Sequence, residues 1–398
     1  MSKSRKPAPT PKANPLPPQP GTLVGNLGEP IILPEIKIDG FAAEAAKDGK
    51  IKVWTKLALT SDDPIFHRMA TNLIATIKNH TAGISVDFDR TKVMLLVIKP
   101  GKHSELWADT AAMSVAAMAK RALEAGNVVF ENDIVDVIAM SFPLVEINKE
   151  DRVFCLFRQD WRFALYFDTN PDKNLSLDEF QRSLGNLFRN LKYRHIYDAI
   201  ESPEISEKLL KAGWFPFAEI ITSEFPDLIK HCEANLDLQS VEERIIASFD
   251  EERLTRLLQR WLAKPHFASR EVVLRSAVKN FLAKDPVAVI KTIVTEIEGI
   301  LNEAYRTQNG VGAKGKALRE FAVALAERKA GNPYTLLMAK PFAEYLEKRM
   351  FADFDPLAGN GDAASRHAVG HGEAKAESYT QVAALQALLT LDQFAFST

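Results

Sequence analysis

The residues best suited to chemistry lie near the carboxyl end, in the stretch SRHAVGHGEAKAESY from Ser365 to Tyr379. Arg366, His367 and His371 lie close together within it. An arginine is always charged and offers a planar fork to phosphate oxygens, whereas a histidine titrates near neutral pH and can take up or release a proton. Metal-free cleavage of RNA needs a base for the ribose 2'-hydroxyl, an acid for the leaving 5'-oxygen and positive charge beside the pentavalent phosphorus. DNA lacks that hydroxyl, so this chemistry would act on RNA.

The same spacing also permits a metal site. An α-helix turns by about 100° per residue, so His367 and His371 would share a face, while Arg366 and His371 would diverge by about 140°. However, HAVGH lacks the glutamate of the zinc-protease motif, and the nearest further ligand is Glu373. The glycines on either side of His371 would weaken a regular helix by roughly 2 kcal/mol, so a bend is expected here. A simpler role is also open, in which the arginine and histidine anchor a loop through hydrogen bonds.

Two other strings match ligand-binding motifs in spacing. In DTNPDKNLSLDEF, oxygen-bearing residues from Asp168 to Glu179 fall at calcium-loop positions, but Lys173 stands where glycine is usual. A strand-to-helix connection, with Ser176 as N-cap and Glu179 completing a capping box, is the simpler interpretation. The string GVGAKG, residues 310–315, follows a helical pattern, which predicts a loop between helices and not a dinucleotide site.

Composition narrows the class of protein. The chain has 398 residues, of which 46% are hydrophobic and 26% charged, enough for two or three domains. No apolar run approaches the roughly 18 residues of a membrane span, and the amino-terminal segment has no apolar h-region. Cys155 and Cys232 predict neither a disulfide framework nor a cysteine-based zinc site. These features favour a cytoplasmic location, and a net charge of -2 excludes a globally basic nucleic-acid binder while permitting a local positive patch.

The hydrophobic pattern predicts an α+β amino-terminal domain followed by a mainly α-helical carboxyl-terminal bundle. The composition of residues 1–22 predicts a disordered, proline-rich tail. The pattern of residues 23–170 predicts a small α+β domain suited to a sensor or regulatory role. Apolar spacings of three and four residues predict a helical region over 171–284 and a helical domain over 285–398. Within the first domain we expect strands in EPIILPEIKI, GISVDFD, KVMLLVIK and VVFENDIVDVIAM, helices over 64–78 and 106–125, and a β-hairpin formed by DRVFCLF and WRFALYFD.

RHAVGH, with four residues between Arg366 and His371, resembles the arginine–histidine signature of the HEPN superfamily. Many of these helical domains are ribonucleases in toxin–antitoxin, phage-exclusion and RNA-processing systems. The string YTQVAALQALLTLDQF resembles the long apolar helix that follows the signature, and EIEGILNEA, residues 296–304, resembles the acidic helix that packs beside it. The resemblance covers about residues 285–398 and departs from the usual pattern at Ser365, where asparagine is frequent.

The resemblance implies a role for each residue. Arg366 would stabilise phosphate and transition-state charge, and His371 would act as general acid and base. His367 and Ser365 would be supporting polar groups, and Glu298 would orient Arg366 across the bundle.

The resemblance also implies partners. RNA, single-stranded or tRNA, would be the substrate, without metal or cofactor, in antiphage or stress defence; no membrane or DNA partner is expected. A homodimer is implied, in which an arginine and a histidine that diverge within one chain converge with those of its mate. Some HEPN domains have lost catalysis, so a non-catalytic dimerisation or RNA/nucleotide-binding protein is the alternative, and a zinc hydrolase using His367 and His371 is a third. Aromatic residues in YRHIY and KAGWFPF are candidates for base stacking, although such clusters are more often core.

Overall fold

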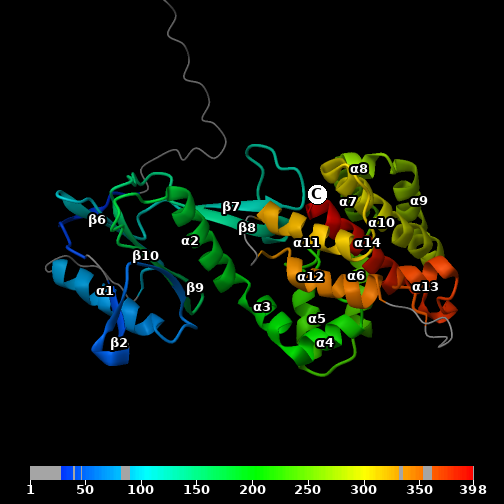
Figure 1. Ribbon diagram of the computed structural model, residues 1–398, viewed down its shortest axis with the longest axis horizontal. Helices are drawn as coiled ribbons and strands as arrows, with labels where there is room; N and C mark the ends of the chain where they lie inside the picture. The colour runs from blue at the N-terminus through cyan, green and yellow to red at the C-terminus, as the bar shows by residue number, and fades with distance from the viewer. Residues whose placement is uncertain are drawn as a thin grey trace, which may run out of the picture.

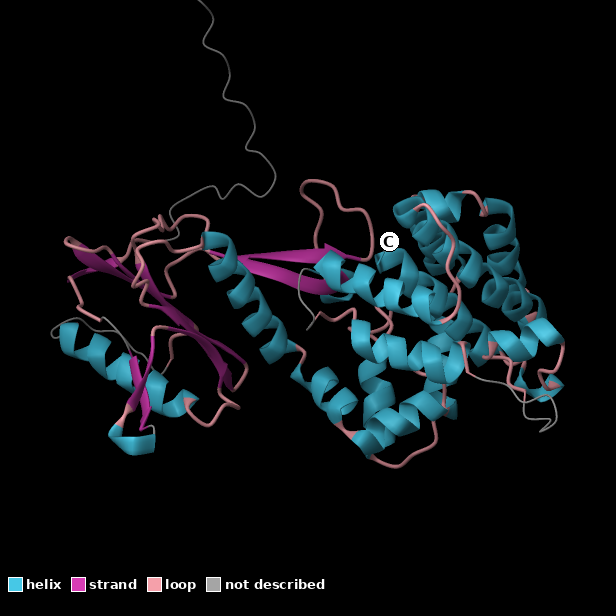
Figure 2. Ribbon diagram, viewed as in Figure 1, coloured by secondary structure: helices cyan, strands magenta, loops and turns pink. Residues whose placement is uncertain are grey.

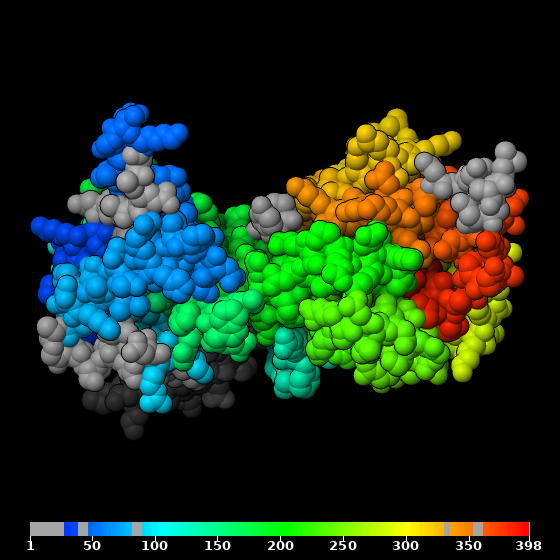
Figure 3. Space-filling model, turned by 90° about the horizontal axis from the view of Figure 1, so that it is seen from below, coloured from blue at the N-terminus to red at the C-terminus, as the bar shows by residue number. Residues whose placement is uncertain are grey.

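The chain forms two lobes at opposite ends of an elongated molecule (Figures 1 and 3). The computed structural model describes residues 28–38, 41–45, 47–81, 90–330, 335–352 and 361–397. The amino-terminal lobe is built on a sheet, and the carboxyl-terminal lobe is almost entirely helical (Figure 2). The predicted order of an α+β part followed by a helical part is therefore confirmed. The predicted tail and the predicted strand GISVDFD lie outside the described residues.

Among the described residues, the main sheet has six strands in the spatial order β1, β6, β5, β9, β10, β4, and all neighbours are antiparallel. Its strands are β1 (Ile31–Pro34), β4 (Lys56–Thr60), β5 (Val93–Ile98), β6 (His103–Ala108), β9 (Arg152–Gln159) and β10 (Arg162–Asp168). The last two are the predicted hairpin. Two smaller pairs are β2 (Phe41–Ala45) with β3 (Ile51–Trp54), and β7 (Ser114–Ala119) with β8 (Ile134–Ser141).

Both faces of the main sheet are covered by helices. Along β5, Leu96 and its even-numbered neighbours pack into a core with α1 (Phe66–His80), which is the helix predicted over 64–78. Leu95 and Val97 point to the other face and pack with α2 (Leu177–Lys192). This two-residue alternation is the expected geometry of a strand between two apolar layers. Because α2 packs on the sheet, the sheet lobe continues past the predicted boundary at residue 170.

The prediction of a helix over residues 106–125 is wrong. The alanine-rich segment holds the end of β6 and all of β7, which pairs with β8 to form an arm that reaches the helical lobe (Figure 1). Alanine favours helix locally, but strand pairing and tertiary contact decide the outcome here. The small side chains allow α2 to approach closely: a Cβ on Gly185 would lie 2.5 Å from the Cα of Ala139 on β8.

The helical lobe shares one continuous apolar core that runs from Tyr193 to Ala395, takes in Val137 of β8 and crosses the predicted boundary at residue 285. Its helices are α3 (Arg194–Glu201), α4 (Pro203–Lys211), α5 (Phe225–Glu233), α6 (Gln239–Ser248), α7 (Glu251–Leu262), α8 (Pro265–Ala268), α9 (Glu271–Leu282), α10 (Pro286–Asn309), α11 (Lys316–Ala330), α12 (Ala339–Tyr345), α13 (Arg366–His371) and α14 (Gln381–Ser397). A π-helical turn, Leu346–Met350, follows α12. None of the described helices is long and apolar enough to cross a membrane.

Local signals in the sequence set the ends of the central helix α10. Asp285 caps its amino end by accepting a hydrogen bond from the backbone N–H of Ala288 at 3.0 Å, and Pro286 occupies the first turn. Gly310 ends it with φ 75°, a left-handed conformation that favours glycine. GVGAKG is therefore the loop between α10 and α11, as predicted. The buried helix α14 packs against α10, with every residue from Leu388 to Ser397 buried.

Candidate functional site

The arginine–histidine motif forms the short helix α13 at the end of the lobe remote from the sheet (Figure 1). Ser365 is its N-cap, and the Ser365 Oγ accepts a hydrogen bond from the backbone N–H of Ala368 at 3.4 Å. The helix ends at Gly372, whose φ is 76°. Gly370 lies inside the helix, so the bend expected from the glycines does not occur before Gly372. Ser365 thus has a structural role. Because α13 is regular from Arg366 to His371, the rotation of about 100° per residue applies to the motif residues.

Arg366 is held from the neighbouring helix α10. Its Nη2 forms an ion pair with the Oε2 of Glu298, the pairing that the family resemblance implies. The arginine side chain is 33% exposed and the glutamate side chain 18% exposed, so both lie at the edge of the core. Solvent can still reach the guanidinium group, which carries five N–H donors. Arg366 is therefore oriented by one carboxylate while part of its surface stays accessible.

The histidines do not converge with Arg366 within one chain. His371 is exposed and His367 is half-buried. Five residues of helix rotate His371 by about 140° from Arg366, so the ion-paired guanidinium and the exposed imidazole lie on different faces. In the described part of the chain, no group of three or more His, Cys, Asp or Glu is arranged to hold a metal ion. The geometry thus offers the zinc hypothesis no third ligand.

The string from Asp168 to Glu179 is a strand-to-helix connection. Lys56 lies between its two ends, 3.5 Å from Asp168 and 2.7 Å from Glu179. The side-chain amide of Asn170 donates to two backbone carbonyl groups. Ser176 caps α2 by accepting a hydrogen bond from the backbone N–H of Glu179 at 3.3 Å. The carboxylates at the two ends of the string are therefore paired with Lys56, and the cap at Ser176 agrees with the simpler interpretation.

A second group of charged side chains, which sequence spacing did not reveal, lies where the β7–β8 arm meets the helical lobe. Arg260 on α7 donates from Nη2 to Asp392 Oδ2 at 2.7 Å and to Glu219 Oε2 at 2.9 Å. The indole Nε1 of Trp261 donates to Asp392 Oδ1 at 2.7 Å. Both carboxylate side chains are only 1% exposed. The negative charges of Asp392 and Glu219 are therefore stabilised almost wholly by protein groups and not by water.

Two more cations complete this group. Arg253 donates from Nε to Glu219 Oε1 at 3.0 Å, and Lys120 at the end of β7 donates from Nζ to the Glu219 carbonyl at 2.7 Å. We call the five residues the junction cluster: Lys120, Glu219, Arg253, Arg260 and Asp392. The cluster ties the arm to α7 and α14 through charge-assisted hydrogen bonds, which are stronger than neutral ones.

Burial and neighbouring charges shift the titration of the cluster. Burial lowers the pKa of Lys120 from 10.5 to about 8, although Glu219 opposes this change. Burial raises the pKa of Asp392 even though Arg260 acts in the opposite direction. For Glu219, burial also opposes ionisation, but Arg260 and Arg253 outweigh it and hold its pKa below the usual value.

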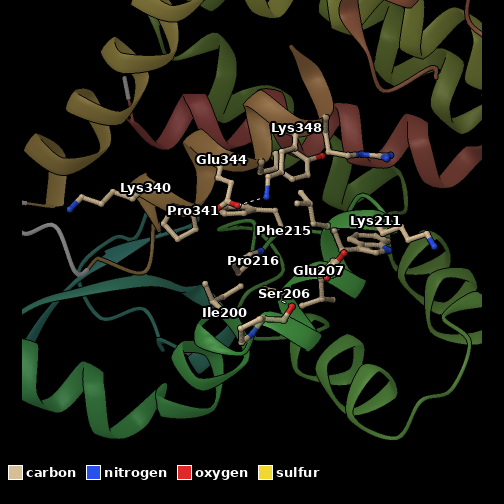
Figure 4. Close-up of a pocket in the computed structure, with 16 residues that line it drawn as sticks. Ile200, Ser206, Glu207, Lys211, Phe215, Pro216, Lys340, Pro341, Glu344 and Lys348 are labelled. Atoms are coloured by element: carbon tan, nitrogen blue, oxygen red, sulfur yellow. Dashed lines mark hydrogen bonds and ion pairs between the residues drawn. The ribbon is translucent and has the colours of Figure 1, made fainter. Parts of the chain in front are cut away.

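A groove of about 880 Å³ lies elsewhere in the helical lobe (Figure 4). It runs between α3, α4 and α12, and neither Arg366 nor His371 lines it. Its charges are mixed, since Lys348 pairs with Glu344 at 2.5 Å. Trp214 and Phe215, from the predicted stacking cluster, contribute to this wall but are buried in the core. The groove is therefore lined by residues of both charges and lies apart from the arginine–histidine motif.

Comparisons with models of protein families, with curated proteins and with solved structures found no match to this chain.

Proposed function

We propose that the protein is a metal-independent endoribonuclease of HEPN type, a cytoplasmic enzyme of antiphage or stress defence. The observation that carries the proposal is the ion pair between Arg366 and Glu298, which fixes the arginine on the helix that also bears the exposed His371. An arginine oriented by one carboxylate and still partly exposed is suited to a phosphodiester, because its free N–H groups can donate to phosphate oxygens. An exposed histidine is suited to exchange protons with a substrate.

In this reaction the ribose 2'-oxygen attacks the adjacent phosphorus while the bond from phosphorus to the 5'-oxygen breaks. His371 accepts the proton of the 2'-hydroxyl and, once protonated, gives that proton to the leaving 5'-oxygen. The products are a 2',3'-cyclic phosphate and a 5'-hydroxyl. Arg366 stabilises the charge that accumulates on the phosphorane oxygens. Glu298 acts as a positioning residue that keeps the guanidinium at one place.

The separation of Arg366 and His371 around α13 leads to a composite site. We infer a homodimer in which Arg366 of one copy and His371 of the other face the same phosphodiester. The position of α13 at the outer end of the lobe makes both side chains available to a second copy without displacement of the core. RNA, single-stranded or tRNA, is the partner that this arrangement would bind.

The test uses purified full-length protein and cells that express it. Arg366→Ala and His371→Ala should each abolish cleavage of single-stranded RNA and tRNA, and both should relieve any growth defect caused by the wild type. The matched control is His80→Ala, which removes an exposed histidine from α1 in the other lobe. Equal amounts of the two silent variants, mixed as a heterodimer, should regain up to about one quarter to one half of the activity if each site takes its residues from different copies.

Glu298→Gln separates positioning from folding. It should lower kcat for RNA cleavage while the unfolding midpoint changes little, since the pair is partly exposed. If wild type leaves RNA intact in cells and in vitro while the Arg366→Ala and His371→Ala variants lose only dimerisation or RNA binding, the non-catalytic alternative is correct.

A further inference from the structure

A concave pocket of about 550 Å³ lies beside the junction cluster, between the end of β7, α7, α11 and the end of α14. Its lining is basic, and none of its lining residues is acidic. The cations are Lys120, Arg121, Arg256, Arg260, Lys264 and Lys329. We call it the basic pocket. It is separate from α13 and from the groove of Figure 4, which contain none of these residues.

The carboxylates near this pocket do not balance its charge. Glu219 and Asp392 lie beneath Arg260, and Asp133 pairs with Arg121 at 2.7 Å. Glu219 is also shared with Arg253, and Glu224 acts on Lys120 as well, so the six cations of the lining still outnumber the carboxylates beside them in the described part of the chain. The net charge of the whole chain is -2, so the excess of positive charge in this pocket is local and does not follow from the composition. Concentrated positive charge in a partly closed site attracts anions, because low-dielectric walls focus the field.

Lys264 and Lys329 are the clearest sign of a missing anion. Lys264 lies between α7 and α8, and Lys329 lies on α11; neither forms a salt bridge within the described residues. The pKa of Lys264 is lowered by partial burial and by the nearby charge of Lys329. Two lysines that repel each other in one pocket cost stability unless an anion lies between them. Arg256, 3.7 Å from Glu219, also keeps donors free for such a ligand.

The remaining walls indicate what accompanies the anion. Met118, Ala119, Ala122, Ala263 and Ala395 give the pocket apolar surface, and Gln259 adds an exposed amide. Apolar walls with a few convergent polar groups, in a volume between about 300 and 1,000 Å³, are typical of small-molecule sites. An extended RNA backbone would instead need a groove that continues across the surface.

We propose that the basic pocket binds the polyphosphate chain of a small ligand, with a nucleoside triphosphate as its chemical class. The phosphates contact Lys264, Lys329 and Arg256, and the nucleoside lies against the apolar wall near Gln259. The pocket borders the β7–β8 arm, so the ligand contacts a segment of the sheet lobe and three helices of the other lobe at once. This binding is independent of ribonuclease activity at α13.

The experiment is isothermal titration calorimetry of the full-length protein with ATP, GTP, CTP, UTP and inorganic tripolyphosphate. We expect one saturable site for a nucleoside triphosphate, weaker binding of tripolyphosphate and a loss of affinity as NaCl is raised. Lys264→Ala/Lys329→Ala should weaken binding by about tenfold to a hundredfold, because each lysine gives a charge-assisted contact. The control, Lys279→Ala/Lys316→Ala, removes two exposed lysines outside the pocket and should bind as wild type does.

A third arm distinguishes nucleotides from RNA. A 12-nucleotide RNA with a 5'-hydroxyl is titrated into Arg366→Ala protein, in which cleavage is absent if the ribonuclease proposal is right. Unfolding midpoints of both double variants verify that each is folded. No saturable binding of any triphosphate or of tripolyphosphate would overturn the proposal, as would equal affinity in Lys264→Ala/Lys329→Ala. Tight RNA binding that this double variant loses, without triphosphate binding, would assign the pocket to RNA instead.

Discussion

The motif helix α13 and the junction cluster are both built on arginine–carboxylate pairs, yet they differ in burial and in origin. In α13 the proposed site residues are neighbours in sequence, and the ion pair from Arg366 to Glu298 is partly exposed. In the junction cluster, residues 120, 219, 253, 260 and 392 come together from distant parts of the chain, and their carboxylates are buried. The motif recognised in the sequence thus carries a partly exposed ion pair, while the buried carboxylates of the junction cluster belong to no motif.

Burial explains the difference in energy. At a surface, water and salt screen an ion pair, and its net contribution is typically below about 1 kcal/mol. In the interior, an ion left without its partner costs several kcal/mol, because it cannot be solvated again. The comparison therefore predicts large stability effects at the junction and small ones at α13, where effects on activity should dominate.

The largest expected effect is that of Asp392→Ala. The change removes the acceptor of Arg260 and of the Trp261 indole N–H, and it leaves a buried guanidinium with Glu219 as its remaining acidic partner. We expect the free energy of unfolding to fall by about 3 to 5 kcal/mol. Urea denaturation followed by circular dichroism measures this loss.

Two controls place that loss in context. Asp227→Ala removes a partly exposed aspartate on α5 that pairs with Lys230 at 3.0 Å and with Arg244 at 3.5 Å, and it should cost less than about 1 kcal/mol. Glu298→Gln, which removes the α10 partner of Arg366, should cost about 1 kcal/mol or less for the same reason. A loss at Asp392 no larger than these would remove the energetic distinction between the two regions.

The second effect is pH-dependent and arises from Lys120. Its pKa is about 8 in the folded protein and near 10.5 in the unfolded chain, so between these values the unfolded state binds more protons. This group therefore makes the folded state more stable as pH rises from 8 to 10.5. Relative to Lys120→Met, wild type should gain up to about 3 kcal/mol of unfolding free energy across that window.

Urea titrations of both proteins at pH 7.5 and pH 10 give this difference directly, because groups common to the two chains cancel. A difference that stays constant with pH would show that Lys120 titrates normally. The same titration with bound triphosphate tests whether Lys120 senses a ligand in the basic pocket. An anion beside Lys120 should raise its pKa and so move the pH range of the stability change to higher pH.

Much of the architecture was predictable because the apolar periodicity is strong. The two-residue alternation along β5 and the three- and four-residue spacing of α10 each correspond to one buried face or core. The cap at Asp285 and the loop at Gly310 follow from side chains that act on their own backbone. The pairing of Arg366 with Glu298 was also expected, through family resemblance and not through spacing.

Other features depend on contacts that spacing does not encode. β7 was expected to be helical because Ala116, Ala117 and Ala119 favour helix, but pairing with β8 makes it a strand. The junction cluster has one weak signal in the sequence, namely Asp392, the single charged residue of α14. A buried aspartate requires a cation, but the sequence alone cannot show that the cation is Arg260.

The smallest expected effect is on the free energy of unfolding when a glycine at α13 is changed. The effect has opposite signs at Gly370 and at Gly372. Gly370 is helical and exposed, and a Cβ there would meet no atom within 4 Å, so Gly370→Ala should stabilise the protein by about 0.5 to 1 kcal/mol. Gly372 has φ 76°, so Gly372→Ala should destabilise by about 1 to 2 kcal/mol. Unfolding midpoints in urea measure both. If both variants were destabilised equally, α13 would not be a regular helix through Gly370, and Arg366 and His371 could then meet within one chain, without a second copy.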